Sequence, residues 1–162
     1  MLKPKLLRQE ISRLVPWVRE NPDRLALYVP RGHVVGRGGA SASFEYRYTL
    51  EVLVMDFPGS TDDIMLAIQL WARQYEPELL FNPDNQKNGI TFEVDILNND
   101  AIDLLVRVQV TEAVAVTSSN GKPVVRHRAD PPPDLMEGMD GWALAVRDMA
   151  STVSGDAAVT NE

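Results

Sequence analysis

The residues able to support catalysis or bind metal are few in this sequence of 162 residues. It contains two histidines, His33 and His127, and no cysteine, which excludes disulfides, thiolate metal sites and cysteine nucleophiles. A metal site needs several ligands at suitable spacing, and no second histidine accompanies either one. Each histidine is therefore predicted to be a surface or hydrogen-bonded residue. The basic cluster at residues 126–128 is too short for a nucleic-acid footprint, and we expect a loop that pairs with an acidic neighbour.

Two other segments resemble binding motifs but lack essential parts of them. The stretch from Asp95 to Asp103 is rich in Asp and Asn, yet it lacks the Asp-x-Asp-x-Asp-Gly order and distal glutamate of a calcium loop. Residues 36–39 read Gly-Arg-Gly-Gly, but a predicted strand follows, whereas a phosphate-binding P-loop continues with Lys and Ser or Thr into a helix. No Gly-x-Ser-x-Gly nucleophile elbow is present. We therefore expect no catalytic residues, no metal and no cofactor, and hence no enzyme.

The charge of the chain disfavours nucleic acid as a binding partner. The net charge is -7, and phosphate binding depends on Lys and Arg. Residues 1–24 carry six Lys or Arg and three Asp or Glu, whereas residues 51–112 carry three and twelve. These unequal regions are either solvated faces or complementary patches that bring copies together head to tail. No apolar run is long enough for a transmembrane helix, and the basic start lacks the apolar stretch of a secretory signal.

The first part of the chain has a helical pattern followed by short extended segments. Apolar residues recur every three or four positions over 4–20, which predicts a helix that Pro16 kinks or ends early. A short strand is predicted over 25–29 and a turn over 30–32. We expect 33–35 to return as the second strand of a hairpin.

Three longer segments alternate apolar and polar residues, which predicts strands over 43–55, 90–96 and 102–116. Between the first two, Ser60 or Thr61 can cap a helix. The apolar face of this helix comprises Ile64, Ala67, Ile68, Trp71 and Tyr75. This order of elements predicts an α+β fold with a mostly antiparallel sheet flanked by helices.

The last part of the chain differs in character from the rest. We expect an α+β domain over residues 1–116, an extended C-terminal arm over 117–150 and a disordered tail over 151–162. The arm contains Trp142 in a segment with few other core residues. Trp142 is therefore predicted to anchor the arm, either on its own domain or on another subunit.

The remaining candidate interface residues lie on the polar faces of the long strands. They are Arg47, Glu93, Asp95 and Arg107. These side chains could pair across subunits, because exposed strands have edges available for pairing. The alternative is that they form solvated strand faces.

A series of segments over residues 1–116 carries a resemblance to a known family. The segments are 1–4 (Met-Leu-Lys-Pro), 21–25 (Asn-Pro-Asp-Arg-Leu), 43–50 (Ser-Phe-Glu-Tyr-Arg-Tyr-Thr-Leu), 82–84 (Asn-Pro-Asp), 89–100 (Gly-Ile-Thr-Phe-Glu-Val-Asp-Ile-Leu-Asn-Asn-Asp) and 111–116 (Thr-Glu-Ala-Val-Ala-Val). In order and spacing they resemble the tail-completion (tail-terminator) proteins, the gpR type, of temperate contractile-tailed bacteriophages.

The resemblance implies a structural protein of the virion. Such a protein is expected to form a ring, typically hexameric, that caps the head-proximal end of the tail tube and sheath. The ring would end polymerisation and provide the surface for head joining. The implied partners are further copies of the chain, the tail tube protein, the tail sheath protein and the head–tail connector protein. DNA would pass through the lumen without specific binding, and no membrane is involved. The implied location is the tail neck region, with assembly in the host cytoplasm.

Two alternatives remain at this point. The first is another head–tail connector ring protein, a stopper, which shares the size, acidity and α+β character. The second is a small-molecule-binding or hydrolytic α+β domain, which requires a pocket lined by convergent polar groups.

Overall fold

The computed structural model describes residues 1–36, 38–97 and 100–128. These residues belong to one compact unit that spans Met1–Asp130. Most of the predicted arm, including Trp142, and all of the predicted tail lie outside the described residues. The division at Val116 therefore stays a prediction.

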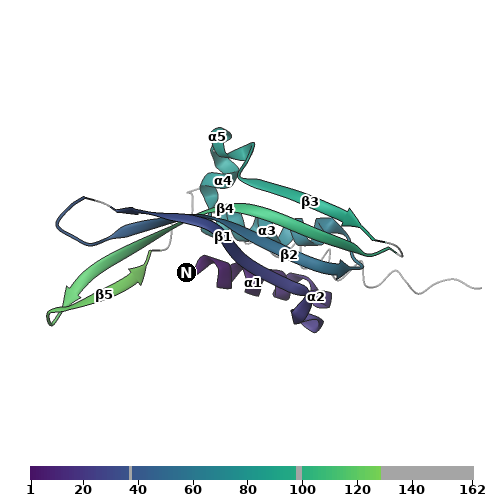
Figure 1. The fold of residues 1–162 in the computed structure, drawn as a ribbon, viewed down its shortest axis with the longest axis horizontal. Helices are drawn as coiled ribbons and strands as arrows, with labels where there is room; N and C mark the ends of the chain where they lie inside the picture. Colours follow the sequence, from purple (N-terminus) through teal and green to yellow (C-terminus); the bar gives the residue numbers. More distant parts are fainter. Residues whose placement is uncertain (37, 98–99, 129–162) are drawn as a thin grey trace, which may run out of the picture. The chain divides into compact units, whose positions relative to one another are not determined.

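The described part of the chain contains a five-stranded antiparallel sheet (Figure 1). Its strands are β1 (Leu25–Gly36), β2 (Phe44–Phe57), β3 (Ile90–Ile96), β4 (Ile102–Ser119) and β5 (Lys122–His127). The strand order is β1-β2-β4-β3, and β5 pairs with β4 beyond the end of β3. The predicted α+β class with a mostly antiparallel sheet is confirmed.

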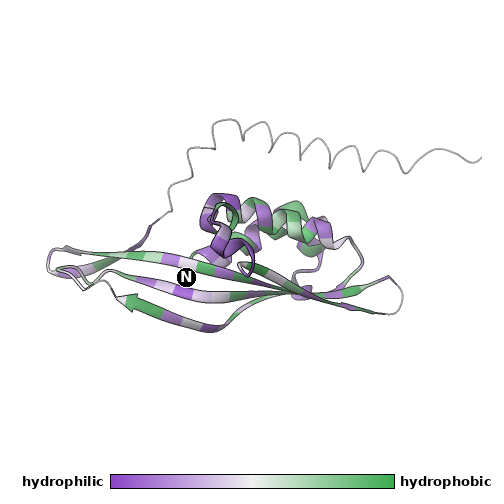
Figure 2. Cartoon of the chain, turned by 90° about the horizontal axis from the view of Figure 1, so that it is seen from above, coloured by the Kyte–Doolittle hydropathy of each residue, from purple (hydrophilic) through white to green (hydrophobic). Residues whose placement is uncertain are grey.

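The helices lie on one face of the sheet and leave the other face uncovered (Figure 2). The helical elements are α1 (Lys3–Leu14), α2 (Pro16–Glu20), the 3-10 turn η1 (Pro22–Arg24), α3 (Thr61–Tyr75), α4 (Pro77–Phe81) and α5 (Pro83–Gln86). Proline begins α2, η1, α4 and α5, a position where its missing N–H costs little. The predicted break at Pro16 is confirmed, whereas α5 occupies part of a stretch whose composition is typical of a loop.

The hydrophobic core lies between the sheet and helices α1 and α3. The alternation along β2 and β4 predicted which side chains point inward, because neighbouring side chains of a strand point to opposite faces. The buried strand residues include Leu50, Val52, Val54, Leu104, Val106 and Val108, and the helices contribute Leu7, Ile11, Ile64, Ile68 and Trp71. Ser60 caps α3, since its side chain accepts a hydrogen bond from the backbone N–H of Asp62 at 3.2 Å.

The predicted hairpin within residues 25–35 is wrong. These residues form one strand, β1, which pairs with β2 along its whole length. The register shifts between Tyr28 and Arg31, and this irregularity accommodates Pro30. Proline is tolerated at a bulge on an edge strand, where no ladder hydrogen bond needs its N–H.

The strand predicted over 102–116 continues to Ser119 and turns into β5. Asn120 and Gly121 form the turn with positive φ angles of 52° and 73°, as a tight hairpin requires. The β4–β5 hairpin and the β1–β2 hairpin leave the same end of the sheet and diverge beyond the helices (Figure 1).

Candidate interaction surface

The uncovered sheet face carries a ladder of charged side chains. Arg107 on β4 donates from Nε to Glu51 Oε1 at 2.8 Å and from Nη1 to Glu93 Oε1 at 2.6 Å. Glu51 lies directly opposite on β2, whereas Glu93 lies on β3, so one guanidinium links three strands. The structure therefore brings together two of the predicted interface residues, Glu93 and Arg107, within one chain.

This ladder shifts the ionisation of its members. The hydrogen bond from Arg107 lowers the pKa of Glu51, because it favours the charged carboxylate. The hydrogen bond between Tyr28 and Glu51 raises the pKa of Tyr28, because the carboxylate favours the neutral phenol. Contacts to Glu93 and then to Glu51 raise the pKa of Arg107. Arg107 therefore stays positive, and its partner Glu51 stays ionised, at neutral pH.

The other predicted interface residues lie apart from this ladder. Arg47 donates from Nε to Glu45 Oε1 at 2.6 Å, two positions away on the same strand. Asp95 on β3 lies directly opposite Asp103 on β4, and within the described residues no cation pairs with Asp95. Intersubunit contacts of Arg47, Glu93, Asp95 and Arg107 stay predictions, as does the contact of Trp142.

Strand β3 is apolar on the helix side of the sheet, yet beyond Ile90 its apolar side chains are exposed. Phe92 and Ile96 are 62% and 82% exposed, although they lie opposite Val106 and Ile102 on β4. Val94 between them is also exposed. The sequence predicted the alternation of β3 but gave no sign that its apolar face is open to solvent.

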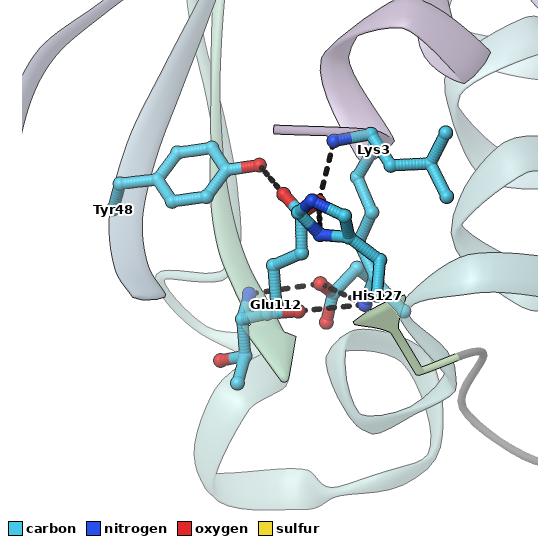
Figure 3. Close-up of polar contacts among 7 residues, drawn as sticks. Lys3, Tyr48, Glu112 and His127 are labelled. Atoms are coloured by element: carbon cyan, nitrogen blue, oxygen red, sulfur yellow. Dashed lines mark hydrogen bonds and ion pairs between the residues drawn. The ribbon is translucent and has the colours of Figure 1, made fainter. Parts of the chain in front are cut away.

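On the helix side of the sheet, the buried carboxylate of Glu112 lies near the start of α1 (Figure 3). Glu112 on β4 is 1% exposed and accepts a hydrogen bond from Tyr48 Oη at 3.0 Å. His127 Nδ1 on β5 lies 2.7 Å from Glu112 Oε1, and the backbone N–H of Leu2 donates to the same oxygen. Burial, and then the nearby Glu112 carboxylate, raise the pKa of Tyr48. This arrangement ties the N-terminus to β2, β4 and β5.

A buried ion pair closes the border of β4 between β3 and β5. Lys3 Nζ lies 2.7 Å from Glu76 Oε1, and both side chains are buried. Lys3 also donates to the carbonyl of Thr111 at 2.6 Å, while the N–H of Thr111 donates to Glu76 at 2.8 Å. The pairing of β3 with β4 ends at Val108, and the pairing of β5 with β4 ends at Val114. Thr111 therefore lies in the stretch of β4 between these two partner strands. The ion pair therefore satisfies backbone groups that a neighbouring strand would otherwise bond.

The contacts of Lys3, Glu76 and Glu112 were not predicted from the sequence. A signal existed for Glu112, since it continues the inward-pointing series of β4 beyond Val110. No comparable local signal identifies the other two residues. The basic cluster was expected to pair with an acidic neighbour, and this is confirmed for His127, which contacts Glu112. His127 lies at the end of strand β5, however, and not in the expected loop.

Among the described residues, no three His, Cys, Asp or Glu side chains come together as a metal site would require. None of the described helices combines the length and apolarity needed to cross a membrane.

These features define the class of protein. It is an antiparallel α+β domain with a bare sheet face, a polar ladder on that face and an apolar strand left open at the sheet border.

Comparison with known proteins identifies the family. The family model described as P2 phage tail completion protein R (GpR) matches residues 1–131, and the chain belongs to this family. The tail completion protein R of Escherichia phage P2 is 36% identical to this chain over 133 residues. The match covers 82% of this chain and 86% of that protein. No solved structure matches. The resemblance predicted from residues 1–116 is confirmed, and the family match extends beyond it.

Proposed function

We propose that this chain completes the phage tail as a structural ring at the head-proximal end of the tail tube. The ring, a hexamer, ends the polymerisation of tube and sheath and provides the surface for joining the head. It works in the neck region of the virion after assembly in the host cytoplasm. Membership in the tail completion protein family supports the role in the tail.

One structural observation carries the finer part of the proposal. Helices cover one face of the sheet, while the other face and the two diverging hairpins stay open (Figures 1 and 2). The β1–β2 hairpin exposes Val34, and the β4–β5 hairpin exposes Val125. Extended open surfaces of this kind suit contacts with several large neighbours, because protein interfaces need far more area than a small-ligand pocket. A ring between tube, sheath and connector has such neighbours.

The charge of the chain suits a channel that DNA must cross. The net charge of -7 repels phosphate, so the proposal includes passage of DNA without specific binding. A ring structure with a lumen lined mainly by Lys and Arg would contradict this part.

The test uses purified full-length protein and purified tail tubes. Negative-stain imaging should show a ring at one end of each tube, and added tube protein should no longer extend that end. Tubes without the protein, which should continue to grow, are the control. Binding only to the portal side of heads would instead support the stopper. Uncapped tubes that keep growing would contradict the terminator role.

A further inference from the structure

We propose that neighbouring copies join by strand pairing, with β3 of one copy antiparallel to residues 31–36 of β1 in the next. This inference rests on the proposed ring, and it names the surfaces that would make the lateral contact.

The topology of the sheet permits this contact without turning either copy over. β1 and β3 form opposite borders of the order β1-β2-β4-β3. Each neighbouring pair is antiparallel, so β3 runs opposite to β1. Two copies side by side in the same orientation therefore bring β3 antiparallel to β1. Such a contact joins two different surfaces and can repeat until a ring closes.

Only the second half of β1 has an edge that suits pairing with a strand of another copy. At its start, Arg8 Nη1 donates to the carbonyl of Leu25 at 3.1 Å. Pro30, at the irregularity, has no N–H to donate. Residues 31–36 lie beyond both and pair regularly with β2 on their other side. This segment is close in length to β3.

The charges of the two borders are complementary. Asp95 on β3 lies opposite Asp103, and like charges directly opposite in a sheet destabilise it. Arg31 and His33 on β1 are exposed and, within the described residues, make no ion pair. All these side chains lie on the uncovered face, since Arg31 is opposite Thr49 and His33 opposite Arg47. Pairing of the borders would place a cation beside the carboxylate of Asp95.

The apolar side chains match on the other face. Val34 on β1 is 58% exposed and lies on the same sheet face as Phe92, Val94 and Ile96. An exposed apolar edge strand favours aggregation unless another chain covers it. Pairing would cover both apolar strips, and aliphatic and aromatic cross-strand neighbours stabilise a sheet.

The register implies a stagger that a closed ring can accommodate. Within one copy, Phe92 is opposite Val106, Val106 is opposite Val52, and Val52 is opposite Leu27. β3 therefore lies at the same height in the sheet as the first half of β1. Pairing with residues 31–36 shifts each copy by about six residues, or roughly 20 Å at about 3.3 Å per residue. Four strands about 4.8 Å apart span roughly the same width. The resulting tilt of about 45° is at the upper end of the range of closed sheets, about 35–45°.

The test uses engineered cysteines, because the chain has none of its own. One variant carries Val34→Cys, and three others carry Phe92→Cys, Val94→Cys or Ile96→Cys to sample the register. After mild oxidation, a mixture of Val34→Cys with at least one of the three should give linked dimers, whereas neither variant alone should. The corresponding double variant should give a ladder of linked species up to the size of the ring in native mass spectrometry.

A matched control combines Val34→Cys with Leu66→Cys, an exposed apolar position on helix α3 and so on neither border strand. This pair should stay unlinked. Rings that cap tubes but link at none of the three β3 positions would overturn the strand pairing and leave the proposed function intact. A link between a copy carrying Val94→Cys and a copy carrying Val125→Cys would also overturn the proposed strand pairing. β3 and β5 lie on the same border of the sheet, so this link would join two copies as a two-fold dimer. A linked ladder without tube capping would support the pairing and overturn the proposed function.

Discussion

Two stretches along the same border of the sheet differ sharply in this molecule. Between β3 and β5, the border of β4 is closed by the buried Lys3–Glu76 pair, which bonds both backbone groups of Thr111. Alongside it, β3 forms the border and exposes Phe92 and Ile96. The first stretch uses charge to exclude a further strand, whereas the second leaves its border open. The chain thus restricts where another strand can add, which edge strands must do to avoid aggregation.

The largest expected effect on stability comes from breaking the closed border. Lys3→Met removes the cation that lies 2.7 Å from the buried carboxylate of Glu76, and loss of one partner of a buried pair costs about 3–5 kcal/mol. Urea unfolding followed by circular dichroism should show this loss. Lys5→Met, at an exposed lysine two residues along, is the control and should change little. Equal effects of the two substitutions would refute the structural role of the pair.

The next effect concerns the buried carboxylate beside the closed border. Tyr48→Phe removes the hydrogen bond to Glu112, and bonds to charged groups contribute about 1.5–3 kcal/mol. The pKa of Tyr48 is raised on folding, so the folded state keeps its proton while the unfolded phenol ionises near its ordinary value of 10.0. Wild-type stability should therefore fall as pH rises above about 10.

Urea unfolding from pH 7 to 11 measures this dependence. The Tyr48→Phe variant should lack the part of the alkaline loss that comes from Tyr48. Tyr46→Phe, a tyrosine two positions along the same strand, is the matched control and should keep it. An unchanged alkaline loss in Tyr48→Phe would contradict the assignment.

A smaller effect is expected on the uncovered face, where water screens the ladder. Arg107→Gln should lower stability less than Tyr48→Phe does, because exposed ion pairs contribute little. The pKa of Glu51 is lowered on folding, so its contribution is present above the ordinary value of 4.5 and is lost as pH falls through the lowered value.

Thermal unfolding at a series of acid pH values tests this prediction. The difference between wild type and Arg107→Gln should shrink as the pH falls below about 4.5. Arg73→Gln, at an exposed position of α3, is the control and should show no such dependence. A pH-independent difference would exclude Glu51 as the relevant partner.

The smallest effect on stability, yet a large one on assembly, is expected at the open border. Asp95→Arg should change the free energy of unfolding by less than about 0.5 kcal/mol, since the site is exposed. It should also reduce ring formation, because two borders would then carry like charge. Native mass spectrometry measures the oligomer, and Arg31→Asp in the same chain should restore it. Glu20→Arg, the same charge change on α2, is the control; equal losses in both variants would point to net charge alone.

Local patterns predicted much of this fold. The helix cap at Ser60, the break at Pro16 and the alternating faces of β2 and β4 each depend on residues close in sequence. The local pattern at Pro30 led to a wrong prediction, because a proline by itself indicates a turn. Pairing with β2 on both sides of the irregularity keeps β1 continuous, and no neighbouring residue signals that partner.

The candidate surface was predicted less completely than the fold. Arg47, Glu93, Asp95 and Arg107 were placed correctly on polar strand faces by their position in the alternation. The partners of these residues were not predictable, since Arg107 pairs with Glu51 from a strand far away in sequence.

The sequence by itself determined which side chains share a face of each strand, because the backbone alternates every two residues. It also determined the family, through the order of short segments spread over the chain. Only the tertiary structure decided which of those faces are covered. β3 and β4 share one alternating pattern, but the core buries Leu104, Val106 and Val108 of β4 and leaves Phe92, Val94 and Ile96 of β3 exposed. Burial depends on what packs above a strand, and that depends on contacts between residues far apart in the chain.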